Sequence, residues 1–429
     1  MTRVLRAAAV ILALAATLAA AAPAAAGEPD ATAPAYTLAL TGSDHGFRWT
    51  GRETLTITNP GAAPLDLIWI RLWGNGPRGC RGTRAVRISA VAGATAGDPA
   101  VSCTAIPLRL AAPIAPGARG SVAFDVEIRV PDVHDRFGHG RNVALLSNAI
   151  PALAHLEGGA WRLDRYFASG EAWTYPAADW TVRLHPPRGI AVAAPGVLQP
   201  DGTRKLERGR DYSFAAGRLR RVRGDVGGVA VTVWGARGRW GKQLEKVMRI
   251  ARRRLPQLAA LYGSYGWPDL QIVVTEDAGM EHTGMIMSPP LDFVVTHELA
   301  HEWWYALISD DQAAAPWLDE AFATYSEEAT GAQRRPWCRR PGPEAGFVTR
   351  PVDFFRHRRR VDYGVIYYEG ACLLDVLRKR MGRERFGTAL REYALAHRYG
   401  WSTATAFRAA MDAASPVPLA DLWRRYRVQ

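Results

Sequence analysis

Lysine and cysteine are both scarce in this chain. Four of its 54 basic residues are lysines, at positions 205, 242, 246 and 379, so arginine supplies nearly all of the net charge of +13. An arginine bias of this kind is typical of coding composition, and we interpret it as a generic basic surface. Nucleic-acid binding is not indicated, because there is no binding motif and the aromatic residues are not interleaved with arginine runs. Weak association with an anionic cell surface stays open.

Other missing patterns exclude several protein classes. The chain has no Gly-x-Ser-x-Gly elbow of a serine hydrolase and no glycine-rich loop that would cradle phosphate. It has no heptad repeat and no glycine triplet period, which excludes coiled coils and collagen. With 429 residues, of which 48% are hydrophobic and 22% charged, the chain is globular and long enough for two or three domains.

The only long apolar run is at the start of the chain. Arg3 and Arg6 precede residues 7–22, and small residues follow up to Gly27. This pattern predicts a secretory signal peptide over residues 1–26, with an uncleaved anchor helix as the alternative. No other stretch could cross a membrane, so the mature protein is predicted to be secreted or to stay in the cell envelope without a transmembrane segment.

Export permits disulfide bonds between the four cysteines. Three pairings are compatible with the sequence. We favour Cys80–Cys103 and Cys338–Cys372, because each pair lies inside one predicted domain. No cysteine pair has zinc-ribbon spacing.

The pattern of hydrophobic residues divides the chain into two halves. Residues 27–235 contain short alternating runs, such as 54–58, 67–72, 122–130 and 229–234, which predict an antiparallel β-sandwich. Residues 236–429 predict a mainly helical domain, with a helix at 240–262, a strand at 270–275 and helices at 291–309 and 317–330. The fold class is therefore α+β and multidomain.

One motif in the second half carries chemistry. In His297-Glu298-Leu299-Ala300-His301, the two histidines lie one helical turn apart and can both reach one Zn²⁺. Glu298 is rotated away from that axis, so it can act as a general base without ligating the metal. The neighbouring residues are apolar almost all round, which predicts a buried helix.

Two further acids follow on the next predicted helix. After eighteen more residues comes Glu320, which we interpret as the third metal ligand. Glu327 lies seven residues later on the same helix face and is expected to orient a ligating histidine. A surface carboxylate is the alternative for Glu327.

These segments together resemble the gluzincin aminopeptidases related to alanyl aminopeptidase and leukotriene hydrolase. The resemblance also includes Ala278-Gly-Met-Glu-His282, similar to the family's Gly-x-Met-Glu-Asn substrate motif, and Tyr367-Tyr-Glu-Gly370, similar to its Tyr-Glu-Lys-Gly segment. It implies a thermolysin-like catalytic domain, one zinc ion per chain, and a short form without the large C-terminal helical domain of many relatives.

The resemblance also implies residue roles. Tyr367 would stabilise the oxyanion, Gly279 and Met280 would lie along the substrate backbone, and Glu281 would pair with the free α-amino group of a peptide. The chain departs from the family at five positions, none of which removes a ligand or the base: Ala278, His282, Asp319, Ala321 and Glu369.

The sequence thus predicts a secreted zinc aminopeptidase. A zinc endopeptidase on the same fold is one alternative, because only 15 residues separate Glu281 from His297 and the cleft would be open. The other alternative is a non-catalytic cell-envelope binding protein with a relict zinc site.

Overall fold

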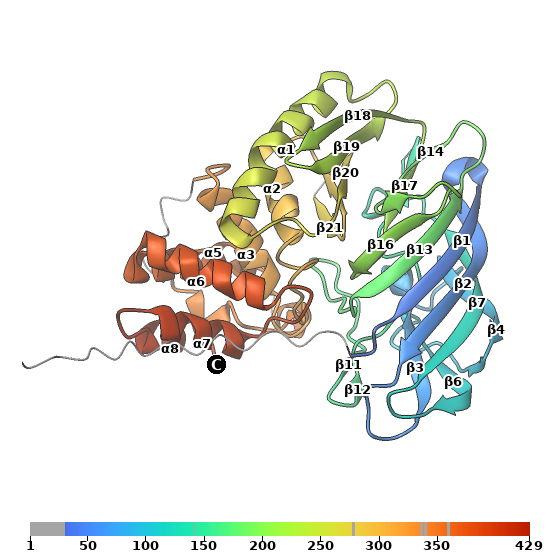
Figure 1. Cartoon of the computed structure of the whole chain (residues 1–429), viewed down its shortest axis with the longest axis horizontal. Coiled ribbons are helices and arrows are strands. Elements are labelled where there is room, and N and C mark those ends of the chain that lie inside the picture. The colour runs from blue at the N-terminus through green and yellow to red at the C-terminus, as the bar shows by residue number, and fades with distance from the viewer. Residues whose placement is uncertain (1–30, 141, 277–278, 335–337, 339–340, 358–360) are drawn as a thin grey trace, which may run out of the picture.

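The computed structural model describes residues 31–140, 142–276, 279–334, 338, 341–357 and 361–429 (Figure 1). The predicted signal peptide and Ala278 lie outside the described residues. Mixed β-sheets and eight α-helices make up the described part of the chain. No helix in that part is both long and apolar enough to cross a bilayer.

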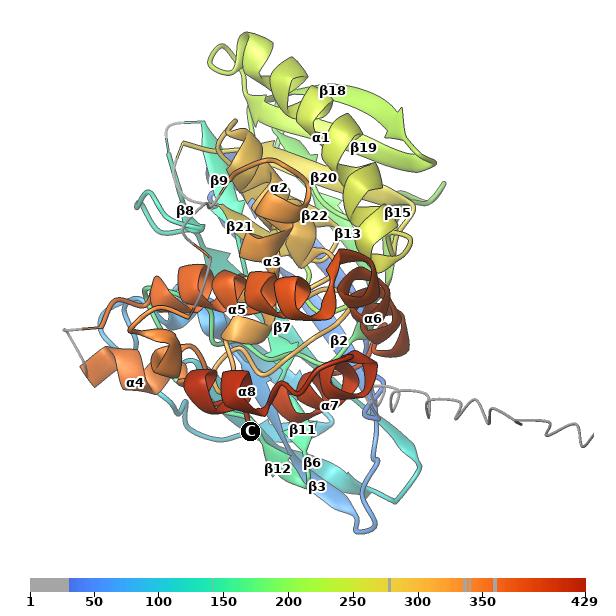
Figure 2. The ribbon, with the colours of Figure 1, turned by 90° about the vertical axis from the view of Figure 1, so that its left-hand side faces the viewer.

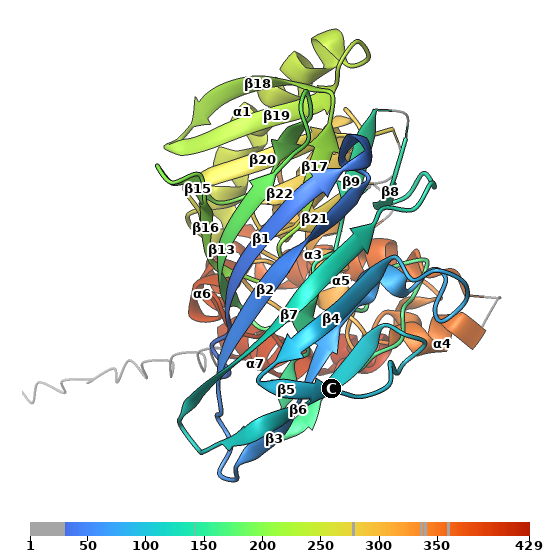
Figure 3. The ribbon, with the colours of Figure 1, turned by 90° about the vertical axis from the view of Figure 1, so that its right-hand side faces the viewer.

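A seven-stranded sheet dominates the N-terminal half (Figure 3). Its strand order is β15-β16-β13-β1-β2-β7-β4, formed by Ala35–Ser43 (β1), Arg48–Thr58 (β2), Val86–Ala92 (β4), Arg119–Arg129 (β7), Ala178–His185 (β13), Val197–Leu198 (β15) and Arg204–Gly209 (β16). Alternate residues of β1 and β7 are buried, as the alternating sequence predicts. The prediction of purely antiparallel pairing is wrong at one place, because β1 and β13 are parallel. The chain between these two strands is long, so no tight hairpin turn requires them to pair antiparallel.

Three smaller sheets complete this half. One has the order β10-β3-β6-β5, from Leu65–Arg71 (β3), Ala94–Ala96 (β5), Ala105–Ile114 (β6) and Ala152–Leu153 (β10). Another has the order β14-β17-β9-β8, from Phe137–His139 (β8), Val143–Leu146 (β9), Ala191–Ala193 (β14) and Phe214–Gly217 (β17). A short hairpin joins Leu156–Glu157 (β11) to Ala160–Trp161 (β12).

The second half is built on a five-stranded sheet of order β18-β19-β20-β22-β21. Its strands are Leu219–Val226 (β18), Val229–Ala236 (β19), Asp269–Val274 (β20), Met280–His282 (β21) and Met285–Ser288 (β22). The predicted domain boundary at residues 235/236 cuts through this sheet, since β19 pairs with β20. Alternation of hydrophobic and polar residues predicts a strand but not the sheet that the strand joins. For this reason the sequence analysis assigned β18 and β19 to the N-terminal domain.

Helices cover one side of this sheet and extend beyond it (Figures 1 and 2). They are Gly241–Tyr262 (α1), Asp292–His301 (α2), Trp317–Ala329 (α3), Val352–His357 (α4), Val365–Met381 (α5), Arg383–Ala396 (α6), Ala404–Ala414 (α7) and Ala420–Tyr426 (α8). Helix α2 ends at His301 rather than at the predicted residue 309. The backbone of Tyr305, at φ 151°, interrupts the helical run, and turns occupy most of residues 302–308.

Both predicted disulfides are confirmed. Cys80 pairs with Cys103 and Cys338 with Cys372, at Cα–Cα distances of 5.2 and 4.9 Å. The second bond ties α5 to the loop that precedes α4. In the chain-entropy description, loops of 23 and 34 residues correspond to about 3–4 kcal/mol of stabilisation each.

Candidate metal centre and substrate cleft

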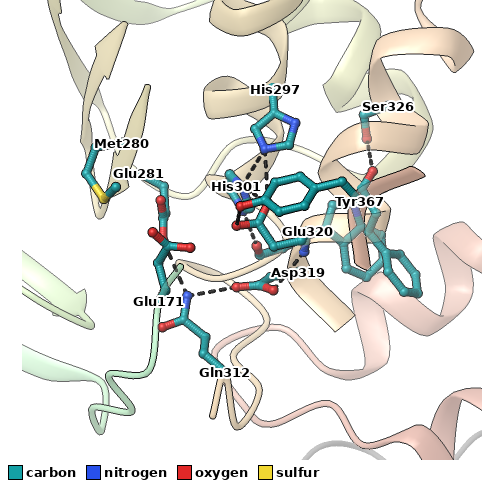
Figure 4. Close-up of polar contacts among 12 residues, drawn as sticks. Glu171, Met280, Glu281, His297, His301, Gln312, Asp319, Glu320, Ser326 and Tyr367 are labelled. Atoms are coloured by element: carbon teal, nitrogen blue, oxygen red, sulfur yellow. Dashed lines mark hydrogen bonds and ion pairs between the residues drawn. The ribbon is translucent and has the colours of Figure 1, made fainter. Parts of the chain in front are cut away.

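Helices α2 and α3 bring three metal-ligand side chains together (Figure 4). Nε2 of His297 lies 3.1 Å from Nε2 of His301 and 3.1 Å from Oε2 of Glu320, and the His301–Glu320 separation is 3.5 Å. Tetrahedral ligands about 2.0–2.1 Å from a zinc ion are about 3.3 Å apart, so the donor set fits Zn²⁺. His301 and Glu320 are buried, and His297 is half-buried.

The other ring nitrogens of both histidines are engaged. Nδ1 of His297 donates to Oε1 of Glu327 at 2.9 Å, and Nδ1 of His301 donates to the backbone oxygen of Trp304 at 3.0 Å. These bonds leave the Nε2 lone pairs directed at the shared centre, which is the orientation that metal binding requires. Trp304 lies in the turn that follows α2. The termination of this helix at His301 therefore helps to orient the His301 ring. Glu327 is 3% exposed and is therefore not a surface acid.

Glu298 lies between the metal triad and strand β21. Its carboxylate contacts Gly279 so closely that a Cβ at position 279 would overlap with it. Burial raises the pKa of Glu298 to about 8, against the opposing charges of His297 and His301. A carboxylate with a pKa near neutrality can both take and return a proton.

Tyr367 reaches the same centre from α5. Its hydroxyl donates to Oε1 of Glu320 at 2.6 Å, and its ring stacks on His297 with centroids 5.9 Å apart. Helix α5 can approach α3 because residue 370 is glycine, where a Cβ would meet Ala321 at 2.5 Å. Tyr368, the next residue along the chain, is 54% exposed.

Strand β21 places Glu281 at the opposite side of the centre. Glu281 is 3% exposed and accepts a hydrogen bond from the side chain of Gln312 at 3.3 Å. Gln312 also donates to Asp319 at 2.7 Å, and Asp319 accepts from the backbone N–H of Glu320 at 2.7 Å. Asp319, a departure from the family pattern, thus links the third ligand to the substrate strand.

The N-terminal half contributes a carboxylate that sequence reasoning missed. Glu171 is 5% exposed and stands beside Glu281 (Figure 4), and burial together with the charge of Glu281 raises its pKa well above the ordinary value. Arg136 donates to Oε1 of Glu171 at 2.6 Å. The second oxygen, Oε2, is buried without a hydrogen-bond partner in the described part of the chain. The only sequence signal was a lone acid in the aromatic stretch 166–177.

A cavity of about 450 Å³ opens on the other face of β21. Met280 and Met287 line it together with Val273, Leu145, Arg136 and Trp240. Successive side chains of a strand point to opposite faces, so Glu281 faces the metal triad and Met280 the cavity. Because β21 is an edge strand, a peptide that pairs with it would direct alternate side chains to the two faces.

Comparisons with known proteins find aminopeptidases among similar sequences and M1 zinc metallopeptidases among similar structures. A probable aminopeptidase 2 from Sulfurisphaera tokodaii is 22% identical over 181 residues, which cover 38% of this chain and 22% of the relative. The crystal structure of an M1 zinc metallopeptidase from Deinococcus radiodurans matches with a TM-score of 0.63 at 19% identity, over 94% of each chain. An E323A mutant from the same organism, bound to a Tyr-Ser-Ala substrate, matches with a TM-score of 0.61 at 20% identity over 94% of this chain and 95% of that one.

The chain is similar to aminopeptidases over part of its sequence, and its fold is similar to that of M1 zinc metallopeptidases. This similarity agrees with the resemblance noted from the motifs. No family model matches the sequence. The match to the Sulfurisphaera relative spans about a fifth of that protein's length, whereas the match in fold to the Deinococcus structure covers 94% of each chain. The departures from the family pattern at His282 and Glu369 have local explanations. His282 bonds to Asp211 at 2.6 Å, and Glu369 accepts from the backbone of Gly342 at 3.1 Å.

Proposed function

We propose that this protein is a zinc aminopeptidase that removes single residues from the N-termini of peptides. The observation that carries the proposal is the pair Glu171 and Glu281, two buried carboxylates beside the metal triad. Arg136 already pairs with Oε1 of Glu171. A peptide's α-ammonium group between the two carboxylates would satisfy the unpartnered Oε2 of Glu171 and compensate the buried charge of Glu281. A chain that continued in the N-terminal direction would leave that oxygen and Glu281 without this partner.

His297, His301 and Glu320 would hold the zinc ion. When bound there, zinc polarises the scissile carbonyl and acidifies the attacking water. Glu298 takes the proton of that water and later delivers it to the leaving amine. Tyr367 donates a hydrogen bond to the oxyanion, which requires its hydroxyl to turn from Glu320 toward the substrate.

Gly279 and Met280 offer backbone groups to the substrate on the free edge of β21. Pairing of this kind fixes the scissile bond relative to Glu298. The absence of a Cβ at Gly279 lets the substrate strand and the base lie in contact. The position of the bound peptide on β21, rather than the reactivity of its bonds alone, would therefore determine that the first peptide bond is cleaved.

We further propose that the protein acts outside the cytoplasm. The N-terminal apolar run with small residues before Gly27 and the two disulfides support this location. Protein exported by its native host should carry Gly27 at its N-terminus, as N-terminal sequencing would detect, whereas an intact Met1 on exported protein would indicate the uncleaved anchor. Recovery of the protein from the cytoplasm alone would contradict the proposal.

One peptide with a free or an acetylated N-terminus tests the function. The zinc-loaded protein should shorten only the free form, one residue at a time, as mass spectrometry records. Glu298→Gln serves as the control for contaminating peptidases. Internal cuts in both forms would move the assignment to an endopeptidase, and no cut in either would favour a binding role.

A matched pair of variants tests the amine anchor. Glu281→Gln and Glu171→Gln should each raise KM for free peptides by about tenfold or more, since each removes part of a buried charge interaction. Asp225→Asn removes a carboxylate on exposed β18 and should change nothing. An unchanged KM in both anchor variants would reject the proposed role.

A further inference from the structure

Most of the net charge of the chain comes from one short stretch. Residues 218–254 contain twelve lysines or arginines and two acids, a net charge of +10 out of +13. Coding composition can raise arginine throughout a chain, but it does not remove the acids from one stretch. The rest of the chain carries only +3, so the sequence interpretation of a generic basic surface does not describe this distribution.

The fold gathers these residues around the edge strand β18 and on the exposed side of α1, and we call this region the basic face. Helix α1 lies alongside β18 and β19 at one end of the molecule (Figures 1 and 2), and the guanidinium of Arg252 reaches Gly224 of β18. The exposed cations of the basic face are Arg218, Arg220, Arg221, Arg223, Arg237, Arg239, Lys242, Lys246, Arg249, Arg252 and Arg253. Arg254 is buried and binds Asp292.

Few of these cations are neutralised. In the described part of the chain, acids pair with only two of them, in Arg239–Glu276 and Arg253–Asp292. Three exposed arginines of the N-terminal sheets are instead paired across strands, in Arg48–Glu127, Arg52–Asp125 and Arg109–Asp66. Partial burial and the charges of Arg223 and Arg204 lower the pKa of Arg221, which reflects the crowding of like charges.

Protection of a sheet edge does not explain the basic face. Charged residues on an edge strand such as β18 commonly prevent aggregation. Helix α1 is not an edge strand, yet it supplies Lys242, Lys246, Arg249, Arg252 and Arg253. An unpartnered cluster of this size costs stability through self-repulsion, and a bound anion would relieve that cost.

The composition of the basic face favours a water-soluble anionic partner over a lipid bilayer. None of the large hydrophobic side chains that are exposed in the described residues lies within 218–254. Surfaces that enter a lipid bilayer normally add such side chains to their cations. The cations follow β18 lengthwise, over eight residues or about 26 Å at ~3.3 Å per residue, which suits an extended chain of charges.

We propose that the basic face binds a linear polyanion with closely spaced phosphate groups. Strand β18 and the substrate strand β21 are the two edges of the same sheet. Four strand spacings of ~4.8 Å separate them by about 19 Å, so a bound polymer leaves the substrate edge free. The protein would be held on an anionic polymer while its cleft stays accessible to peptides.

Binding of the full chain to fluorescent long-chain polyphosphate tests this proposal. We expect the logarithm of the affinity to fall linearly with the logarithm of salt concentration, because neutralised phosphates release counterions. The variant R220E/R221E/R223E on β18 should lose at least tenfold in affinity. R87E/R119E/R188E, which changes the same charge on exposed arginines of the N-terminal half, should lose clearly less.

A second variant protects the test against misfolding. R249E/R252E alters two exposed positions of α1 and should also weaken binding by at least tenfold, with an unchanged thermal midpoint. No binding to polyphosphate at low salt would overturn the proposal. Equal losses of affinity in the basic-face and control variants would also overturn it, because binding would then depend on total charge. Binding to anionic phospholipid vesicles without binding to polyphosphate would overturn it as well.

Discussion

Gly279 and Glu298 are in direct contact across the substrate cleft. The carboxylate of Glu298 occupies the space that a Cβ at position 279 would need. The proposed general base and the residue that precedes the edge strand β21 are therefore positioned by each other. This contact joins α2 to the start of β21, and the sequence shows these two segments only as separate motifs.

Gly279→Ala should disturb this contact. We expect kcat to fall by about tenfold or more, because a displacement of about 1 Å between a base and its substrate has large kinetic effects. Gly387→Ala on α6, where a Cβ meets nothing within 4 Å, is the matched control and should keep full activity. Steady-state kinetics on a free tripeptide separates the two, and a fully active Gly279→Ala would contradict the contact's importance.

Glu298→Gln should retain zinc and lose hydrolysis. The amide keeps the shape of the side chain but cannot accept the proton, so kcat should fall by about 10²–10⁴-fold. Zinc content by elemental analysis should stay near one per chain. Full activity in this variant would reject Glu298 as the base.

Glu327→Gln should weaken metal binding without removing a ligand. The Glu327 carboxylate holds Nδ1 of His297 at 2.9 Å, and loss of such partners typically lowers zinc affinity by about 10–100-fold. Competition with a chromophoric chelator measures the affinity. Glu328→Gln, one position along α3, is the control. Equal affinities in both variants would mean that Glu327 does not orient the ligand.

Asp292→Asn should destabilise the protein in a pH-dependent way. Although partial burial opposes it, bonds and charges from Arg254 and Arg253 lower the pKa of Asp292. A lowered folded-state pKa means that the carboxylate stabilises the fold above its unfolded pKa of about 3.9, and that this stability is lost as pH falls further. The variant should therefore melt lower than wild type at pH 7, and the gap should narrow below about pH 4. A pH-independent gap would contradict the ion-pair explanation.

Reduction of the disulfides should lower stability. C338S/C372S and C80S/C103S should each cost about 2–5 kcal/mol in the free energy of unfolding. Denaturant titration measures both. Only the first pair includes a residue of α5, the helix of Tyr367, so C338S/C372S should also lower activity at temperatures well below its melting temperature. Equal activities of the two variants would show that α5 is held by packing alone.

The sequence alone determined what depends on local spacing. Two histidines four residues apart must share a helix face, and Glu320 and Glu327 must do the same on α3. Alternation along residues 54–58 and 122–130 predicted which residues of β2 and β7 are buried. The cysteine pairing followed from the division of the chain into halves.

The tertiary structure decided what depends on long-range contact. Glu171 and Arg136 reach the cleft from the N-terminal half, more than a hundred residues before the metal motif, and no local pattern marks them. The same holds for the sheet that β18 and β19 join, the end of α2 at His301 and the basic face. Periodicity states which face of an element is buried but not which element covers it, because that choice depends on packing and charge summed over the whole fold.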